Sequence, residues 1–190
     1  MGQRWNEMTE PLSLEEYAGA RPTPRPTRPS DSWVQLPQSP EAGEAGSGYY
    51  TYGTDETDRP GTGANAQWGP ARAMQVITSA ASRLANGQYE TPFGVGNISL
   101  QGGGPFKGHK GHKDGLSIDV RPPRLDKKET RVDYLDPKYD KAGTQRLVDA
   151  LWASGGVEKV YFNGPGLLGV TPDRAGVKIH DNHLHIKIKP

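Results

Sequence analysis

The histidines constrain the fold of this chain more than any other residue type. All five lie in two short, widely separated segments: the first contains His109 and His112, and the second contains His180, His183 and His185. Each histidine alone could be a solvated loop residue or part of a polar strand face. Imidazole, however, is both a common metal ligand and a common acid–base group. The joint clustering therefore predicts a fold that brings the two segments together at one site.

Both segments adjoin a sequence with the two-residue alternation of a β-strand. In the strand predicted over 183–189, His185 lies on one face and the aliphatic residues lie on the other. In the strand predicted over 116–121, Asp119 is likewise opposite aliphatic neighbours, although alone it could be a surface ion-pair partner. We expect the loop residue His112 to meet Asp119 and His185 over the sheet. Imidazole and carboxylate are the usual ligands of a catalytic zinc ion, which needs three protein groups and an open position.

The remaining pattern predicts an α+β fold, with a small, mostly antiparallel sheet and flanking helices. Apolar residues recur at helical spacing over 70–84 and 144–153, and glycine follows each segment as a stop signal. Further strands are predicted over 95–100, 157–162 and 176–179. Helix and strand do not alternate regularly, which argues against a parallel sheet built from βαβ units.

The N-terminal residues 1–47 differ from the rest of the chain. They contain seven of the 17 prolines, which remove backbone donors and favour extended conformations. We interpret them as a Pro-rich arm or linker preceding a domain over 48–190. The arm is either a plain disordered tail or a segment that docks through Trp33, Val34 and Leu36. In the second case, a separate docking partner for the arm is one interpretation.

Composition excludes several classes of function. The 23 Lys and Arg residues nearly balance the 22 Asp and Glu residues, so no global field draws the chain to nucleic acid or to a membrane surface. The basic run over 107–113 is short and lacks interleaved aromatic residues, which argues further against nucleic acid. Cysteine is absent, which removes disulfides and thiolate chemistry. The first thirty residues hold no apolar run typical of a signal peptide, and no stretch has the length of a membrane span.

The chain resembles the penicillin-insensitive murein endopeptidases, which belong to the LAS group of metallopeptidases. Residues 108–120 and 180–185 carry the specific part of the resemblance, because they match the family pattern His-x-x-His-x-x-Gly-Leu-x-x-Asp followed by His-x-x-His-x-His. Residues 97–103 and 160–163 add consistency. The resemblance extends over about 49–188 and implies the same type of small antiparallel sheet with flanking helices.

The resemblance also implies roles for individual residues. His112, Asp119 and His185 correspond to the zinc ligands of the family. His183 corresponds to the general base, with His180 as the other candidate for that role. His109 and His180 line the catalytic site.

The function implied is hydrolysis of peptide cross-links in bacterial cell wall, at the bond from D-Ala to meso-diaminopimelate. The expected partners are therefore the cross-linked peptides of peptidoglycan, and the expected place of action is the periplasm or the cell wall. Delivery by a phage or by a secretion machine would account for the absence of a visible signal segment. Two alternatives stay open: a D,D-carboxypeptidase or dipeptidase on the same metal site, and a non-catalytic module that binds metal or cell wall.

Overall fold

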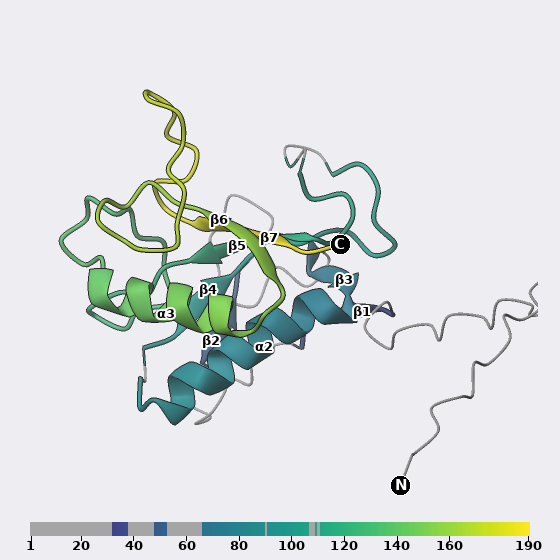
Figure 1. Cartoon of the computed structure of the whole chain (residues 1–190), viewed down its shortest axis with the longest axis horizontal. Helices are drawn as coiled ribbons and strands as arrows, with labels where there is room; N and C mark the ends of the chain where they lie inside the picture. The colour runs from purple at the N-terminus through teal and green to yellow at the C-terminus, as the bar shows by residue number, and fades with distance from the viewer. Residues whose placement is uncertain (1–31, 38–47, 53–65, 90, 107–108, 110) are drawn as a thin grey trace, which may run out of the picture.

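The computed structural model describes residues 32–37, 48–52, 66–89, 91–106, 109 and 111–190. Within this part of the chain the fold is α+β, with two helices and two sheets (Figure 1). The elements in chain order are β1 (Trp33–Gln35), β2 (Tyr49–Thr51), β3 (Trp68–Pro70), α2 (Ala71–Asn86), β4 (Phe93–Val95), β5 (Ser117–Arg121), α3 (Lys141–Ala153), β6 (Val157–Tyr161) and β7 (Leu184–Ile188).

The larger sheet has five strands in the order β2-β4-β5-β7-β6. All neighbours in it are antiparallel except β2 and β4, which run parallel. The smaller sheet consists of β1 and β3, paired antiparallel. The expectation of a mostly antiparallel sheet is confirmed. The central strands β5 and β7 each adjoin one of the two histidine segments, which are far apart in the sequence, so strand pairing brings these segments together.

The two predicted helices are present, with shifted ends. Helix α2 begins directly after Pro70, which is its N-cap, and ends at Asn86 with Gly87 as the C-cap. Helix α3 begins three residues before the predicted start at Thr144, because the side chain of Asp140 accepts a hydrogen bond from the backbone nitrogen of Gly143 at 2.8 Å. This N-cap satisfies a backbone donor that the first turn leaves unpaired.

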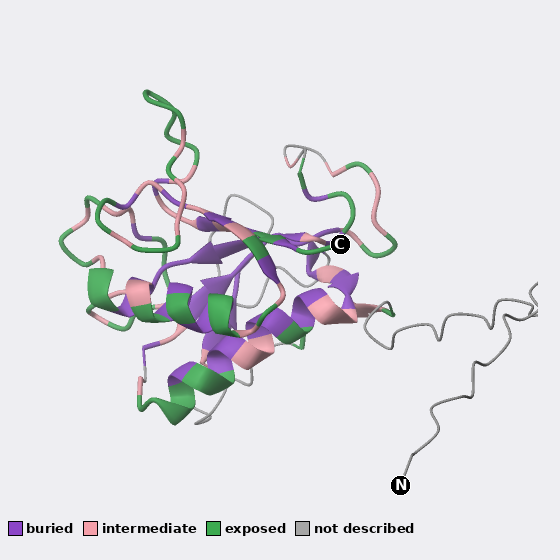
Figure 2. Ribbon diagram, in the orientation of Figure 1, coloured by how far each residue is buried: buried purple, intermediate pink, exposed green. Residues whose placement is uncertain are grey.

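The hydrophobic core lies between the helices and one face of the larger sheet. The fully buried aliphatic residues of β5 and β7 pack in one cluster with those of α2 and α3, among them Ile118, Ile186, Ile77 and Leu147. Figure 2 shows buried residues along the strands and on the helix sides that face them, and exposed residues on the outer sides. Because side chains alternate along a strand, the opposite face of β5 and β7 is left for polar residues.

Two of the predicted strands are wrong in whole or in part. Of 95–100 only Val95 belongs to a strand, and Ser99 forms an isolated bridge with Gln67. Residues 176–179 form no strand: Gly176 has a φ of +84°, and Val177 donates a hydrogen bond to the carbonyl of Arg174 at 3.0 Å. The alternation there is misleading because it faces no core, and Ile179 is 64 % exposed.

Part of the predicted N-terminal arm belongs to the fold. Strand β1 pairs with β3, and Leu36, directly after β1, is 1 % exposed in the hydrophobic core. The docking residues considered for the arm therefore lie against the domain, whereas residues 1–31 and 38–47 lie outside the described residues. Neither of the described helices has the length and apolar character needed to cross a membrane.

Candidate metal centre

Asp119 is the centre of the histidine cluster. It lies in β5 directly opposite His185 of β7 in the strand register, so the two side chains share the face turned away from the core. Oδ1 of Asp119 is 2.9 Å from Nδ1 of His185 and 3.3 Å from Nε2 of His112. Asp119 is 7 % exposed, and a buried carboxylate needs such partners. Three groups from two distant segments therefore converge at one point.

His112 is held on the loop that precedes β5. Its Nδ1 lies 3.2 Å from the carbonyl oxygen of Ile98, which can only accept, so this nitrogen carries the proton. When the ring is neutral, Nε2 carries the lone pair, on the side of Asp119, as metal binding requires. When the ring is protonated, Nε2 donates to Oδ1 of Asp119 at 3.3 Å. A fixed tautomer of this kind is typical of histidine ligands in metal sites.

A glycine allows this loop to approach the smaller sheet closely. Gly115 has a φ of +68°, and a Cβ there would lie 2.5 Å from Cα of Gly69 and 3.0 Å from the ring of Trp33. A residue with a side chain would be strained by the backbone conformation and blocked by β1 and β3. The position of the loop, and with it of His112, therefore depends on the packing of β1 and β3.

One group in the cluster could hold a metal ion: the ligand atoms of His109, His112 and Asp119 lie within 4.8 Å of one another. His185 also contacts Asp119, so His112, Asp119 and His185 form a second set to consider. Two ligands of a tetrahedral zinc ion with bonds of about 2.0–2.1 Å would lie about 3.3 Å apart, and Oδ1 of Asp119 is 3.3 Å from His112 and 2.9 Å from His185. Asp119 and His112 are common to both sets, and His185 and His109 are the two candidates for a further position.

His109 has a different environment from His185. Its ring nitrogens face the side-chain nitrogen of Asn97, at 3.1 Å for Nε2, and its ring packs on Phe106 with the centroids 4.5 Å apart. Burial lowers the pKa of His109, only partly offset by the charge of Asp119. The ring is therefore neutral near pH 7, which permits either metal binding or a contact with a substrate.

His183 lies beside Asp119 without a direct hydrogen bond to it. Its Nε2 is 3.7 Å from Oδ1 of Asp119, and its Nδ1 is 2.9 Å from Oδ1 of Asn182. Donation from Nδ1 to Asn182 leaves the lone pair on Nε2, toward the centre of the cluster. Burial lowers the pKa of His183 to about 4, and the neighbouring histidines contribute further. The imidazole is therefore a free base near neutral pH.

The charges of the cluster favour an ionised Asp119. Burial alone would raise the pKa of this carboxyl group, but hydrogen bonds from His112 and His185 hold it well below its usual range. Burial likewise opposes charge on His112, but the hydrogen bond and charge of Asp119 raise the pKa of that ring overall. The cluster thus has one fixed negative charge among several imidazoles, which suits a cation.

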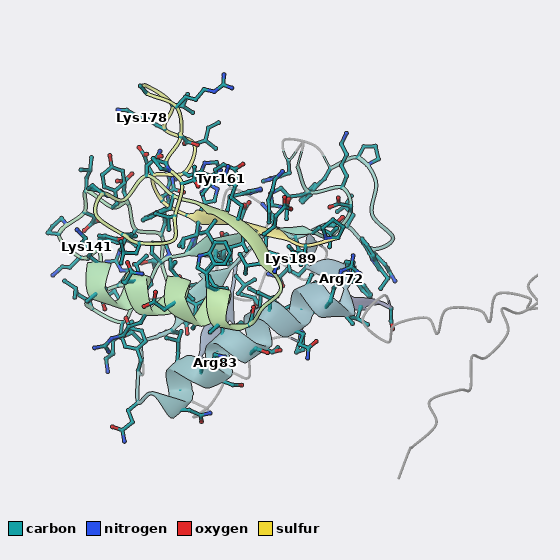
Figure 3. All side chains as sticks on the ribbon, viewed as in Figure 1. Arg72, Arg83, Lys141, Tyr161, Lys178 and Lys189 are labelled. Atoms are coloured by element: carbon teal, nitrogen blue, oxygen red, sulfur yellow. The ribbon has the colours of Figure 1, made fainter. Side chains whose placement is uncertain are left out.

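His180 lies near the end of the loop between β6 and β7. Its Nδ1 lies 2.5 Å from Oδ1 of Asp173, and its ring stacks on Tyr161 with the centroids 5.5 Å apart. The ring centroids of His183 and His185 lie 5.4 Å and 5.5 Å away. Figure 3 shows Tyr161 where β6 ends and Lys178 on the loop that projects beyond it.

All six residues named from the sequence lie in this one region. The structure brings His112, His183 and His185 directly around Asp119, with His109 and His180 at its two sides. Sequence reasoning missed the residues that hold the histidines: Asn97, Asp173 and Asn182 make these contacts, and Tyr161 stacks on His180. Asn97, Tyr161 and Asn182 lie in stretches that carry the resemblance, but no role was predicted for them, and Asp173 lies outside these stretches.

No model of a known protein family matches this chain, and a search of curated proteins found no match either. The fold and the site therefore define its class: an α+β protein with a buried group of histidine and aspartate that could hold a metal ion.

Proposed function

We propose that this protein is a zinc-dependent peptidase that hydrolyses the peptide cross-links of bacterial cell wall. The observation that carries the proposal is the convergence of His112 and His185 on one carboxylate oxygen of Asp119, with the free base His183 beside it. A structural metal site would need no such base. A metallohydrolase needs at least a set of metal ligands and a general base next to the metal.

The donor set favours zinc over other divalent metals. Imidazole nitrogens combined with a single carboxylate suit zinc, whereas calcium and magnesium prefer sites built from oxygen. We assign His112, Asp119 and His185 as ligands, because His185 lies directly opposite Asp119 in the sheet and contacts it. His109, whose ring faces Asn97, is assigned to the wall of the site.

In peptide hydrolysis the metal ligands and His183 would have different roles. Zinc, when bound, polarises the scissile carbonyl and makes water easier to deprotonate near neutral pH. His183 accepts the proton of the attacking water at Nε2, since Asn182 holds its Nδ1 proton. The same nitrogen then returns the proton to the leaving amine as the C–N bond breaks.

The substrate class rests on the resemblance of residues 108–120 and 180–185 to the murein endopeptidases. On that basis the scissile bond joins D-Ala to meso-diaminopimelate in cross-linked peptidoglycan. The protein would act in the periplasm or at the cell wall, delivered by a phage or a secretion machine, with the N-terminal arm as the docking element.

Mass spectrometry of muropeptides tests this function. We expect the zinc-loaded protein to convert purified cross-linked dimers into monomers, with the new amine on diaminopimelate. Release of free D-Ala with the cross-links intact would identify a D,D-carboxypeptidase instead. If the dimers stay uncleaved in the presence of zinc-loaded protein, the peptidase function is wrong and the protein is a non-catalytic binding module.

A variant of His183 separates catalysis from metal binding. His183→Ala should lower the rate of dimer cleavage about 100-fold or more while zinc content is retained, because a positioned base contributes about that much. The matched control is Asp149→Asn on the exposed side of α3, whose side chain bonds, among the described residues, only to Gln145. Full activity of His183→Ala would remove this residue from the mechanism.

A further inference from the structure

A hydrogen-bonded network at the base of the projecting loop includes a carboxylate that the proposed chemistry does not use. Asp173 accepts from Nδ1 of His180 through Oδ1, and from the backbone nitrogen of His180 through Oδ2 at 3.1 Å. The side chain of Asp173 is 9 % exposed. One carboxylate therefore binds both the ring and the backbone of the same histidine.

Asn163 in turn fixes the position of Asp173 through hydrogen bonds. The side-chain nitrogen of Asn163 donates to Oδ2 of Asp173 at 3.0 Å and to Oδ1 of Asp181 at 2.7 Å. The backbone nitrogen of Asp173 donates back to the side-chain oxygen of Asn163 at 2.7 Å. Asn163 lies two residues after the end of β6, so the sheet fixes the position of the carboxylate.

This arrangement determines which ring nitrogen of His180 is available. A carboxylate oxygen can only accept, so the bond places the proton on Nδ1. Among the described residues none forms a hydrogen bond with Nε2 of His180, while Tyr161 stacks on the ring and restricts its rotation. Nε2 is left as the polar atom that this histidine can offer in a site shared with His183 and His185.

We propose that Asp173 is a positioning residue that holds His180 in one orientation and one tautomer, so that Nε2 contacts a polar group of the substrate peptide at the scissile bond. The substrate contact rests on the proposed peptidase function, whereas the orientation and tautomer do not. By contrast, the partner of His183 is a neutral amide, that of Asn182. The two histidines are therefore held by different chemistry for different tasks.

Nitrogen-15 NMR of the full-length, zinc-loaded protein tests the positioning directly. The imidazole signals of His180 are assigned by comparison with His180→Ala. We expect the proton on Nδ1 in the wild type and its loss or redistribution in Asp173→Ala. Asp181→Ala is the matched control, because it removes a bond to the same Asn163 without touching the ring of His180. A wild-type His180 with the proton on Nε2 would overturn the proposal even if Asp173→Ala failed to fold.

Kinetics on cross-linked muropeptides separate positioning from a merely structural role. Asp173→Ala should lower kcat about tenfold or more, as is usual for residues that orient a functional histidine, with zinc content unchanged. In a His180→Ala background the same substitution should change kcat by less than about twofold, because the two residues act as a unit. An equal loss in both backgrounds would show that Asp173 acts through loop structure. Failure of the peptidase function would appear differently, as uncleaved dimers with the wild-type protein.

Discussion

A single carboxylate oxygen organises the chemistry at the scale of residues. Oδ1 of Asp119 faces nitrogens of His112, His183 and His185 at 3.3, 3.7 and 2.9 Å. These nitrogens differ in their outer partners, since the carbonyl of Ile98 holds His112 and the amide of Asn182 holds His183. Identical side chains can therefore have different roles, because the outer partner sets the tautomer and the protonation of each ring.

The choice between His185 and His109 as the third ligand can be measured. We expect His185→Ala to weaken zinc binding at least about 100-fold, because it removes a ligand, whereas loss of an outer partner alone costs about 10–100-fold. His109→Ala should retain nearly the wild-type affinity. Competition with a zinc-binding dye measures both. The opposite ranking would place the metal in the group of His109, His112 and Asp119.

At the scale of elements, the loop over 111–115 links the metal centre to the smaller sheet. Gly115 packs against Gly69 of β3 and against the ring of Trp33 in β1. Strand β1 is three residues long, and a two-stranded pairing of this size is weak without packing. Burial of the neighbouring Leu36 therefore stabilises the attachment of β1.

Truncation of Leu36 tests this attachment. Leu36→Ala should lower the free energy of unfolding by about 2–4 kcal/mol, because it leaves a cavity in the core. Leu168→Ala is the control, since that residue is 77 % exposed and should cost less than about 0.5 kcal/mol. Chemical denaturation measures both variants. Equal, small effects would mean that β1 does not pack on the domain in solution.

For the whole molecule, the central pairing of β5 with β7 joins the two histidine segments into one site. The core covers one face of this pair and the cluster lies on the other, so formation of the site and of the fold depend on the same contacts. A ligand that binds only the folded arrangement must therefore raise the stability of the entire domain.

Zinc should consequently raise the melting temperature. At a free zinc concentration 100 times the Kd, binding contributes about 2.7 kcal/mol, which corresponds to about 5–10 °C for a chain of this size. Differential scanning fluorimetry with and without a chelator measures the shift. Asp119→Ala should show no shift, and a shift equal to that of the wild type would locate the metal elsewhere.

Much of the arrangement follows from local patterns in the chain. The helical spacing of apolar residues in α2 and α3 and the alternation in β5 and β7 are properties of the sequence itself, because each element must turn one face to a core. The same alternation placed Asp119 and His185 on the face opposite the aliphatic residues. The clustering of five histidines in two segments, together with the alternation around Asp119, identified six site residues that the structure brings into one region.

Other features were decided only by tertiary contacts. The strand expected over 176–179 does not exist, since its alternating residues meet no core, and the start of α3 depends on the cap at Asp140. Asp173 and Asn97 were missed because they contact their histidines across loops that no periodic pattern describes. Sequence alone determined which face of each strand bears the polar groups, because that depends on neighbours along the chain. The register that sets His185 opposite Asp119, and the outer partners of each ring, depend on residues that only folding brings together.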